Sequence, residues 1–211
     1  MNADLTSFLV PRWLPERTKA VKYYISFDED ASKMTPDEFW EFSRQNPNMR
    51  AELTKDGEVT LMSPTGFESS YENSQINFQL TSWANKDGSG VATESNGGYI
   101  LPNGATYAPD AAWTQRTRLD KFTKAERKRF LALCPDFVIE LLSFSDKLGE
   151  QQAKMEEYIE NGLRLGWLID PSRNTVHIYR PDRQPEILDN PKSVSGEAVL
   201  PGFKLDLTKI W

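Results

Sequence analysis

A chain of 211 residues with 38% hydrophobic and 11% aromatic residues is long enough to bury the core of one domain. Its longest apolar runs, such as 137–142, stay far below the roughly 20 residues of a membrane span, and its first residues lack the pattern of a secretory signal, so we expect a cytoplasmic protein with no membrane partner. The net charge of −6 argues against a surface coated for nucleic-acid binding, and the single cysteine, Cys134, excludes an intrachain disulfide and a multi-cysteine zinc site.

The chain divides near residue 35. Residues 1–34 show no clean hydrophobic period and are predicted to form an arm or extension, whereas residues 35–211 are predicted to form a single domain. Thr35 predicts a helix start, because it is followed by a proline at the first helical position and by Glu38, which completes a capping box. This helix should end near Pro47.

The next segment alternates between strand and helix signals. The turn Asp56-Gly57 separates two strand-like runs and predicts a β-hairpin over residues 51–62, because glycine accepts the positive φ of a tight turn. No Gly or Pro interrupts residues 67–86, and their apolar side chains recur at helical spacing, which predicts a helix. Short strands are predicted at 91–93, 99–101 and 110–114, followed by a short helix that begins at Thr123.

The second half of the chain continues this alternation. The apolar run 137–142 is interrupted only by Glu140 and predicts a central strand buried on both faces. Residues 147–161 carry an apolar stripe at helical period and predict an amphipathic helix. Two further strands are predicted at 165–169 and 175–179. The order of elements predicts an α/β fold with a mixed central sheet flanked by helices.

One segment reverses the charge of this acidic chain. Residues 114–130 carry seven basic and two acidic residues, 7 − 2 = +5, which leaves −11 for the remainder. The basic residues are Arg116, Arg118, Lys121, Lys124, Arg127, Lys128 and Arg129. The segment is either a solvated helix face or a surface that contacts nucleic-acid phosphates, and its position between two candidate metal ligands favours phosphate contact.

Those candidate ligands are two acids at the ends of strand-like runs, Asp110 in APDAAW and Glu140 in PDFVIELL. Carboxylate oxygens are the ligands that Mg²⁺ prefers, and bound Mg²⁺ neutralises the charge of a phosphodiester and lowers the pKa of a coordinated water. A buried carboxylate without a partner is costly, and a metal ion would offset that cost. Alternatively, Glu140 pairs with an arginine or lies at a strand end.

Lys154 lies at the border of the apolar stripe of the predicted helix 147–161, so it can bury its stem and direct its ammonium along the sheet edge. There it would position or deprotonate the attacking water, or stabilise the phosphate. Burial near a cation could lower its pKa enough for base chemistry. The alternative is an exposed helix lysine that pairs with Glu150 or Tyr158.

Other chemistries lack the residues that they need. His177 is the only histidine and is expected to be structural, which excludes histidine-rich zinc sites and gives Ser-His-Asp catalysis poor support. Cys134 precedes Pro135 and has no evident base partner. The sequence contains neither of the Gly-rich phosphate-binding motifs, so a nucleotide cofactor has no visible cradle.

At these residues the chain resembles the Uma-type endonuclease family, a branch of the PD-(D/E)XK nuclease superfamily with the restriction-endonuclease-like fold. The similarity covers roughly residues 52–211, and its strongest parts are LPNGATYAPDAAW, CPDFVIELLS, KMEEYIENGLRLGWLIDP and VLPGFKLDL. The resemblance implies that Asp110 is the motif aspartate, that Glu140 is the second acid, and that Mg²⁺ or Mn²⁺ is the cofactor.

The chain departs from the superfamily pattern at one position. The superfamily has a lysine two residues after the second acid, where this chain has Leu142. The resemblance implies that Lys154 on the following helix takes the role of that lysine. It also implies a helix acid, which maps to Glu68 or to Glu72 four residues later, with Glu68 preferred. Either could instead be a solvated surface acid.

The sequence therefore predicts a metal-dependent endonuclease that acts on DNA and whose basic segment contacts phosphates. A homodimer would allow two chains with one active centre each to cut both strands. Two alternatives stay open: a non-catalytic nucleic-acid-binding or regulatory module of the same fold, and a hydrolase of another phosphoester.

Overall fold

The structure is a computed structural model that describes residues 24–25 and 33–211. The predicted arm, residues 1–34, lies outside the described residues apart from 24–25 and 33–34. The helices are α1 (Pro36–Gln45), α2 (Phe67–Asp87), α3 (Arg116–Leu119), the 3₁₀ turn η2 (Glu126–Lys128) and α4 (Leu148–Glu160). None of the described helices is both long and apolar enough to cross a membrane.

The described strands are short and fall into three sheets. They are β1 (Tyr24–Ile25), β2 (Arg50–Leu53), β3 (Val59–Met62), β4 (Gly90–Glu94), β5 (Tyr99–Ile100), β6 (Thr106–Tyr107), β7 (Ala111–Gln115), β8 (Phe137–Leu141), β9 (Leu165–Asp170), β10 (Thr175–Tyr179), β11 (Glu186–Asp189), β12 (Ser193–Ser195) and β13 (Lys204–Asp206).

The first predicted elements form as expected. The Thr35 hydroxyl accepts a hydrogen bond from the Glu38 amide at 3.3 Å, and the Glu38 carboxylate accepts one from the Thr35 amide at 2.7 Å. This capping box begins α1. Strands β2 and β3 pair antiparallel around Gly57, whose φ of +81° lies in the left-handed region that glycine adopts readily. Phe39 of α1 packs against Leu53 of the hairpin.

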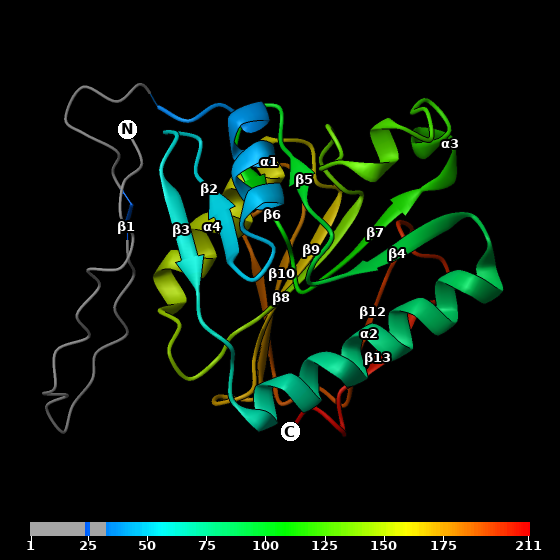
Figure 1. Ribbon diagram of the computed structural model, residues 1–211. Coiled ribbons are helices and arrows are strands. Elements are labelled where there is room, and N and C mark those ends of the chain that lie inside the picture. Colours follow the sequence, from blue (N-terminus) through cyan, green and yellow to red (C-terminus); the bar gives the residue numbers. More distant parts are fainter. Residues whose placement is uncertain (1–23, 26–32) are drawn as a thin grey trace, which may run out of the picture.

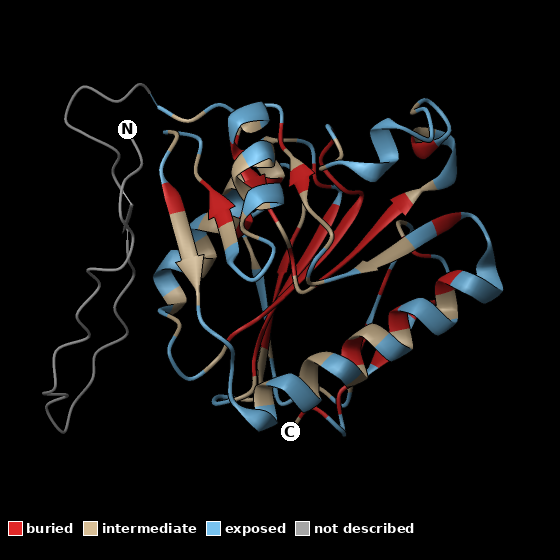
Figure 2. Cartoon of the chain, viewed as in Figure 1, coloured by how far each residue is buried: buried red, intermediate tan, exposed pale blue. Residues whose placement is uncertain are grey.

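The central sheet has six strands in the order β11-β10-β9-β8-β7-β4. Strand β8 is parallel to β9 and antiparallel to β7, so the sheet is mixed. All residues of β8 are buried, as expected for a strand that is covered on both faces (Figure 2). A second sheet has the order β1-β3-β2-β6-β5, and β12 pairs with β13. The predicted α/β fold with a mixed central sheet and flanking helices is confirmed.

Helices α2 and α4 lie on opposite sides of the central sheet (Figure 1). On the α2 side, a hydrophobic core contains Trp113 of β7 and Phe137 of β8. On the α4 side, a second core contains Val138 of β8 together with Met155 and Tyr158 of the helix. The smaller sheet contributes to this second core through β5 and β6. Alternate side chains of β7 and β8 therefore enter different cores.

The segment between β7 and β8 differs from the prediction. The helix expected to begin at Thr123 is reduced to the single turn η2, although the Thr123 hydroxyl still accepts a hydrogen bond from the Glu126 amide at 3.3 Å. A four-residue helix, α3, precedes it and was not predicted. Strands β6, β11, β12 and β13 were also not predicted. These elements have only two to four residues each, which is too short to display a hydrophobic period.

Alanine substitutions at two glycines, Gly90 and Gly149, should change the stability of the fold in opposite directions. A Cβ atom on Gly90 would meet the Trp113 ring and would lie 2.5 Å from the Thr114 carbonyl oxygen. We expect Gly90→Ala to lower the stability by about 1–3 kcal/mol because the strand pair must shift. Gly149 in α4 has no atom within 4 Å of its Cβ position, so Gly149→Ala should add about 0.5–1 kcal/mol. Thermal unfolding of both variants measures this difference, and equal shifts would contradict the packing.

Candidate active site

The pairing of β7 with β8 brings the two predicted acids together. Ala111 lies opposite Ile139 in the antiparallel register, so the preceding residue, Asp110, lies opposite Glu140. The Oδ2 atom of Asp110 accepts a hydrogen bond from the Leu141 amide at 2.9 Å. This bond holds the Asp110 carboxylate against β8, next to Glu140.

Helix α4 presents Lys154 to this acid pair. Lys154 Nζ lies 3.0 Å from Glu140 Oε1, and Tyr158, one helical turn later, donates a hydrogen bond to the same oxygen at 3.1 Å. The ammonium also lies 5.0 Å from the centre of the Tyr107 ring, within the range of a cation–π attraction. Only 15% of the Lys154 side chain is exposed, so Lys154 is not the exposed helix lysine that was considered as the alternative. The structure thus brings Asp110, Glu140 and Lys154 together.

Glu52 on β2 is a third acid of this site, which the sequence analysis missed. Its Oε1 atom accepts hydrogen bonds from Lys154 Nζ at 2.9 Å and from the Ala108 amide at 2.9 Å. Lys154 therefore bridges Glu52 and Glu140, which belong to different sheets. The alternation of apolar and polar residues in β2 assigns Glu52 to a solvent-facing position. Its burial depends on α4 and on the segment after β6, which no local pattern reveals.

Burial, and to a smaller extent the charge of Glu52, raise the pKa of both predicted metal ligands. Burial raises the pKa of Glu140, the charges of Asp110 and Glu52 raise it further, and Lys154 lowers it only in part. Burial also raises the pKa of Asp110, although the hydrogen bond from the Leu141 amide opposes this effect. Three carboxylates surround one buried ammonium, so the fully ionised cluster carries −3 + 1 = −2.

The pKa of Lys154 is raised, which corrects the expectation of a lowered value. Burial alone would lower this pKa, but the charges of Glu140 and Glu52 and the hydrogen bonds to both carboxylates outweigh burial. In the metal-free protein the ammonium is therefore protonated at neutral pH. It can donate hydrogen bonds and stabilise an anion, but it cannot act there as a general base.

The donor set suits a hard divalent cation. Within the described part of the chain, no three His, Cys, Asp or Glu side chains are grouped closely enough to hold a metal ion. Mg²⁺, however, is usually bound by only one or two carboxylates, and water and substrate phosphates complete its coordination. Asp110 and Glu140 offer two carboxylates from adjacent strands, and their raised pKa values indicate a shortage of positive charge around them.

A comparison with protein families shows to which family this chain belongs. The model of the Uma2 family, described as "Putative restriction endonuclease", matches residues 36–208. The chain belongs to the Uma2 family. The match confirms the resemblance inferred from the sequence motifs. It also spans Glu52, Asp110, Glu140 and Lys154, so all four residues of the cluster lie within the family segment.

A solved structure shares the fold of this Uma2 family member. It is a crystal structure from Anabaena variabilis ATCC 29413, described as "a putative nuclease belonging to DUF820", with a TM-score of 0.70 and 21% sequence identity. The similarity covers 84% of this chain and 97% of that one. The two proteins therefore share the restriction-endonuclease-like fold over most of their length. A comparison with curated proteins found no match.

The predicted helix acids of this Uma2 family member lie in the first two turns of α2. Glu68 is exposed and Glu72 is half-buried, and burial, together with the charge of Glu68, raises the pKa of Glu72. Among the described residues, neither acid forms a hydrogen bond or ion pair with the acid pair. Helix α2 is instead joined to the site by Asn77, whose side-chain amide donates to the Asp110 carbonyl oxygen at 2.9 Å. The catalytic role of Glu68 stays a prediction.

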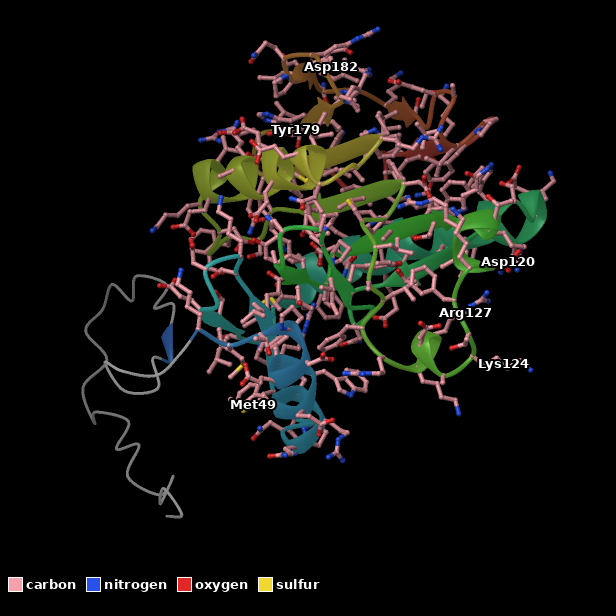
Figure 3. The ribbon with its side chains drawn as sticks, turned by 90° about the horizontal axis from the view of Figure 1, so that it is seen from above. Met49, Asp120, Lys124, Arg127, Tyr179 and Asp182 are labelled. Atoms are coloured by element: carbon pink, nitrogen blue, oxygen red, sulfur yellow. The ribbon has the colours of Figure 1, made fainter. Side chains whose placement is uncertain are left out.

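The basic segment lies at the end of β7 that is remote from Asp110. It begins at Arg116, six residues further along an extended strand, which corresponds to about 20 Å. Figures 1 and 3 both show α3 and the loop after it on the opposite side of the molecule from α4. The segment connects the far ends of the antiparallel strands β7 and β8. Its position between the two acids in the sequence therefore does not bring it close to them.

Arginines and lysines of this segment have different surroundings. All four arginines bind backbone carbonyls or acids of this chain: Arg116, Arg118, Arg127 and Arg129. Three lysines are exposed and form no ion pair within residues 33–211: Lys121, Lys124 and Lys128. Figure 3 shows Lys124 at the rim of the molecule. The lysines are therefore better placed than the arginines to meet an external phosphate.

The two residues that the sequence analysis set aside are buried. Cys134 donates from its thiol to the Tyr158 carbonyl oxygen at 3.6 Å, and burial raises the pKa of this thiol to about 12. His177 lies within β10, where burial lowers its pKa. A thiol with a raised pKa is a poor nucleophile. Both Cys134 and His177 are therefore interpreted as buried structural residues.

Because of the buried acids of this site, the metal-free protein should become less stable to unfolding as pH rises. The raised pKa of Glu140 means that its contribution to stability is complete below the unfolded pKa of about 4.3 and is lost as pH rises through the folded pKa. In the presence of EDTA, Glu140→Gln should therefore unfold at a higher temperature than the wild type at pH 8. The gain should be on the order of 1 kcal/mol, or about 2–4 °C, and it should shrink as pH falls toward 5.

Calorimetric scans over that pH range measure the effect, with Glu160→Gln on the exposed surface of α4 as the matched control. The control should show no pH-dependent difference. A Glu140→Gln variant that is less stable than the wild type by the same amount at every pH would contradict the assignment of the raised pKa.

Proposed function

We propose that this protein is a metal-dependent endonuclease that hydrolyses phosphodiester bonds of DNA. The observation that carries the proposal is the position of Asp110 opposite Glu140 on adjacent strands, with the Lys154 ammonium 3.0 Å from Glu140. Membership of a family described as "Putative restriction endonuclease" supports this reaction class, and so does the fold shared with a protein described as a nuclease.

Each residue of the cluster has a separate task in this proposal. Asp110 and Glu140 would hold Mg²⁺ or Mn²⁺, and when bound the ion would neutralise phosphate charge and acidify a water. Lys154 donates hydrogen bonds to the phosphate or the attacking water and stabilises developing negative charge, because its raised pKa keeps it protonated. Glu52 and Tyr158 are positioning residues: Glu52 holds Lys154, and Tyr158 holds Glu140.

DNA is the proposed substrate because the family of this chain is described as "Putative restriction endonuclease", and restriction endonucleases cut DNA. The exposed lysines Lys121, Lys124 and Lys128 offer phosphate contacts on a chain that is otherwise acidic. We further propose that two copies act on duplex DNA, because each chain supplies one acid pair and each strand needs one cut. A dimer would linearise a plasmid directly, whereas a single centre would first produce nicked circles.

Plasmid cleavage in Mg²⁺ or Mn²⁺ tests the reaction and its residues. We expect the wild type to cleave and EDTA to abolish cleavage. Asp110→Asn, Glu140→Gln and Lys154→Met should each lower the rate by about 100-fold or more, the scale on which removal of one electrostatic stabiliser lowers kcat. Glu160→Gln, on the exposed surface of α4, should keep wild-type activity.

The other outcomes each point to a different function. Equal activity in the wild type and the three variants would overturn the proposed mechanism. DNA binding without cleavage, unaffected by Asp110→Asn, would indicate a non-catalytic binding module. Metal-dependent cleavage of RNA but not of the plasmid would assign the same site to another phosphoester.

A further inference from the structure

A second concave site lies apart from the acid cluster. A cavity of about 400 Å³ is enclosed by α1, β4, β5, the end of β7, α3 and the chain around η2. This volume falls within the range of small-ligand pockets. Thr114, near the end of β7, lines the cavity, whereas Asp110 immediately precedes the other end of the same strand. The two residues are four apart, so they lie on the same face of β7.

One wall of the cavity is aromatic and held in place. The Trp40 and Phe130 rings meet edge to face with centroids 4.9 Å apart, and the Arg129 guanidinium lies 5.5 Å from the centre of the Trp40 ring. Arg129 is itself fixed by an ion pair with Asp37 at 2.6 Å. Both rings are half-buried. Phe39 stacks on Phe130 with centroids 5.6 Å apart, and Arg129 lies over Trp40, so a flat ligand ring would contact the parts of the two rings that these residues leave uncovered. Because the rings are already held in place, this contact costs little entropy.

Polar groups also line the cavity. The hydroxyl groups of Thr93 and Tyr99 lie 2.8 Å apart and form a hydrogen bond. The neighbouring turn contains Gly98, where a Cβ atom would collide with the Phe130 ring, so the turn can approach the aromatic wall only because this residue is glycine. Asn96 completes this polar lining. Hydroxyl and amide groups can form hydrogen bonds with the edge of a heterocyclic base.

The rim of the cavity carries three consecutive cations, Arg127, Lys128 and Arg129. Two of them are paired with acids of this chain, Arg127 with Asp120 at 3.2 Å and Arg129 with Asp37. Lys128 is exposed and forms no ion pair within residues 33–211. Lys128 therefore gives the rim one positive charge that no acid of residues 33–211 neutralises, and this charge can attract an anionic ligand. An aromatic wall, a polar edge and a cationic rim together match a base with its phosphate.

We propose that this cavity holds one unpaired nucleotide of the DNA strand, with its base against Trp40 and Phe130 and its phosphate beside Lys128. The proposal rests on the DNA substrate proposed above. The cavity would then select sites at which that base is unpaired.

Binding of a fluorescent oligonucleotide tests this site without cleavage. A short single-stranded DNA carries 2-aminopurine at one position, EDTA is present, and fluorescence quenching and anisotropy are recorded. We expect the wild type to quench the base. Val91→Trp, which places a large ring in the cavity from the exposed edge strand β4, should remove the quenching. Lys128→Ala should weaken binding several-fold and lower the salt dependence by about one phosphate contact.

Lys204→Ala is the control, because Lys204 is an exposed lysine of β13 that lies outside the basic segment and does not line the cavity. It should bind as the wild type does. Equal losses in Lys204→Ala and Lys128→Ala would overturn the proposal in favour of general charge attraction, even if Val91→Trp failed to fold. Quenching that survives in folded Val91→Trp would also overturn it, as would equal affinity for an oligonucleotide with an abasic site at the labelled position.

The two proposals fail in different ways. Quenching that depends on Lys128, combined with no cleavage in Mg²⁺ or Mn²⁺, would support the nucleotide site and reject the endonuclease. Cleavage that persists without any such quenching would support the endonuclease and reject the nucleotide site.

Discussion

The Lys154 ammonium lies between the carboxylates of Glu52 and Glu140, at 2.9 and 3.0 Å, in the region where the two larger sheets and α4 meet. Asp110 adds a third acid through the pairing of β7 with β8. One lysine cannot neutralise three carboxylates, and burial raises the pKa of both Asp110 and Glu140. The fold therefore maintains negative charge that Lys154 does not neutralise, which supports the proposed binding of a divalent cation.

Local signals were sufficient for much of the fold and for three residues of the site. A capping box, a glycine turn and apolar stripes each specify backbone conformation within a few residues, so α1, the hairpin, α2 and α4 formed where they were predicted. Asp110 and Glu140 were named because an acid in or beside an apolar strand is costly without a partner, and Lys154 because its position borders the apolar stripe of its helix. The resemblance to the nuclease family pointed to the same three residues. The structure brings them together, and their catalytic roles stay predictions.

Long-range packing explains what the sequence did not reveal. Glu52 alternates with apolar residues as a solvent-facing side chain would, and it is buried only because α4 and the chain after β6 cover it. The basic segment follows Asp110 closely in sequence, yet β7 carries it to the far end of the sheet. The expectation of a lowered pKa for Lys154 did not take account of its two acid partners: the charge of Glu140 raises this pKa most, and the charge of Glu52, from a different sheet, raises it further. None of these contacts has a local signature.

Binding of Mn²⁺ to the wild type, Asp110→Asn and Glu140→Gln, followed by calorimetry from pH 6 to pH 8, tests the central claim most directly. The account predicts that the wild type binds Mn²⁺ more tightly as pH rises, because Glu140 must lose its proton before it can bind the ion. Each variant should lose about 10-fold or more in affinity. Equal Mn²⁺ affinity in all three proteins, or an affinity that does not change with pH, would contradict it.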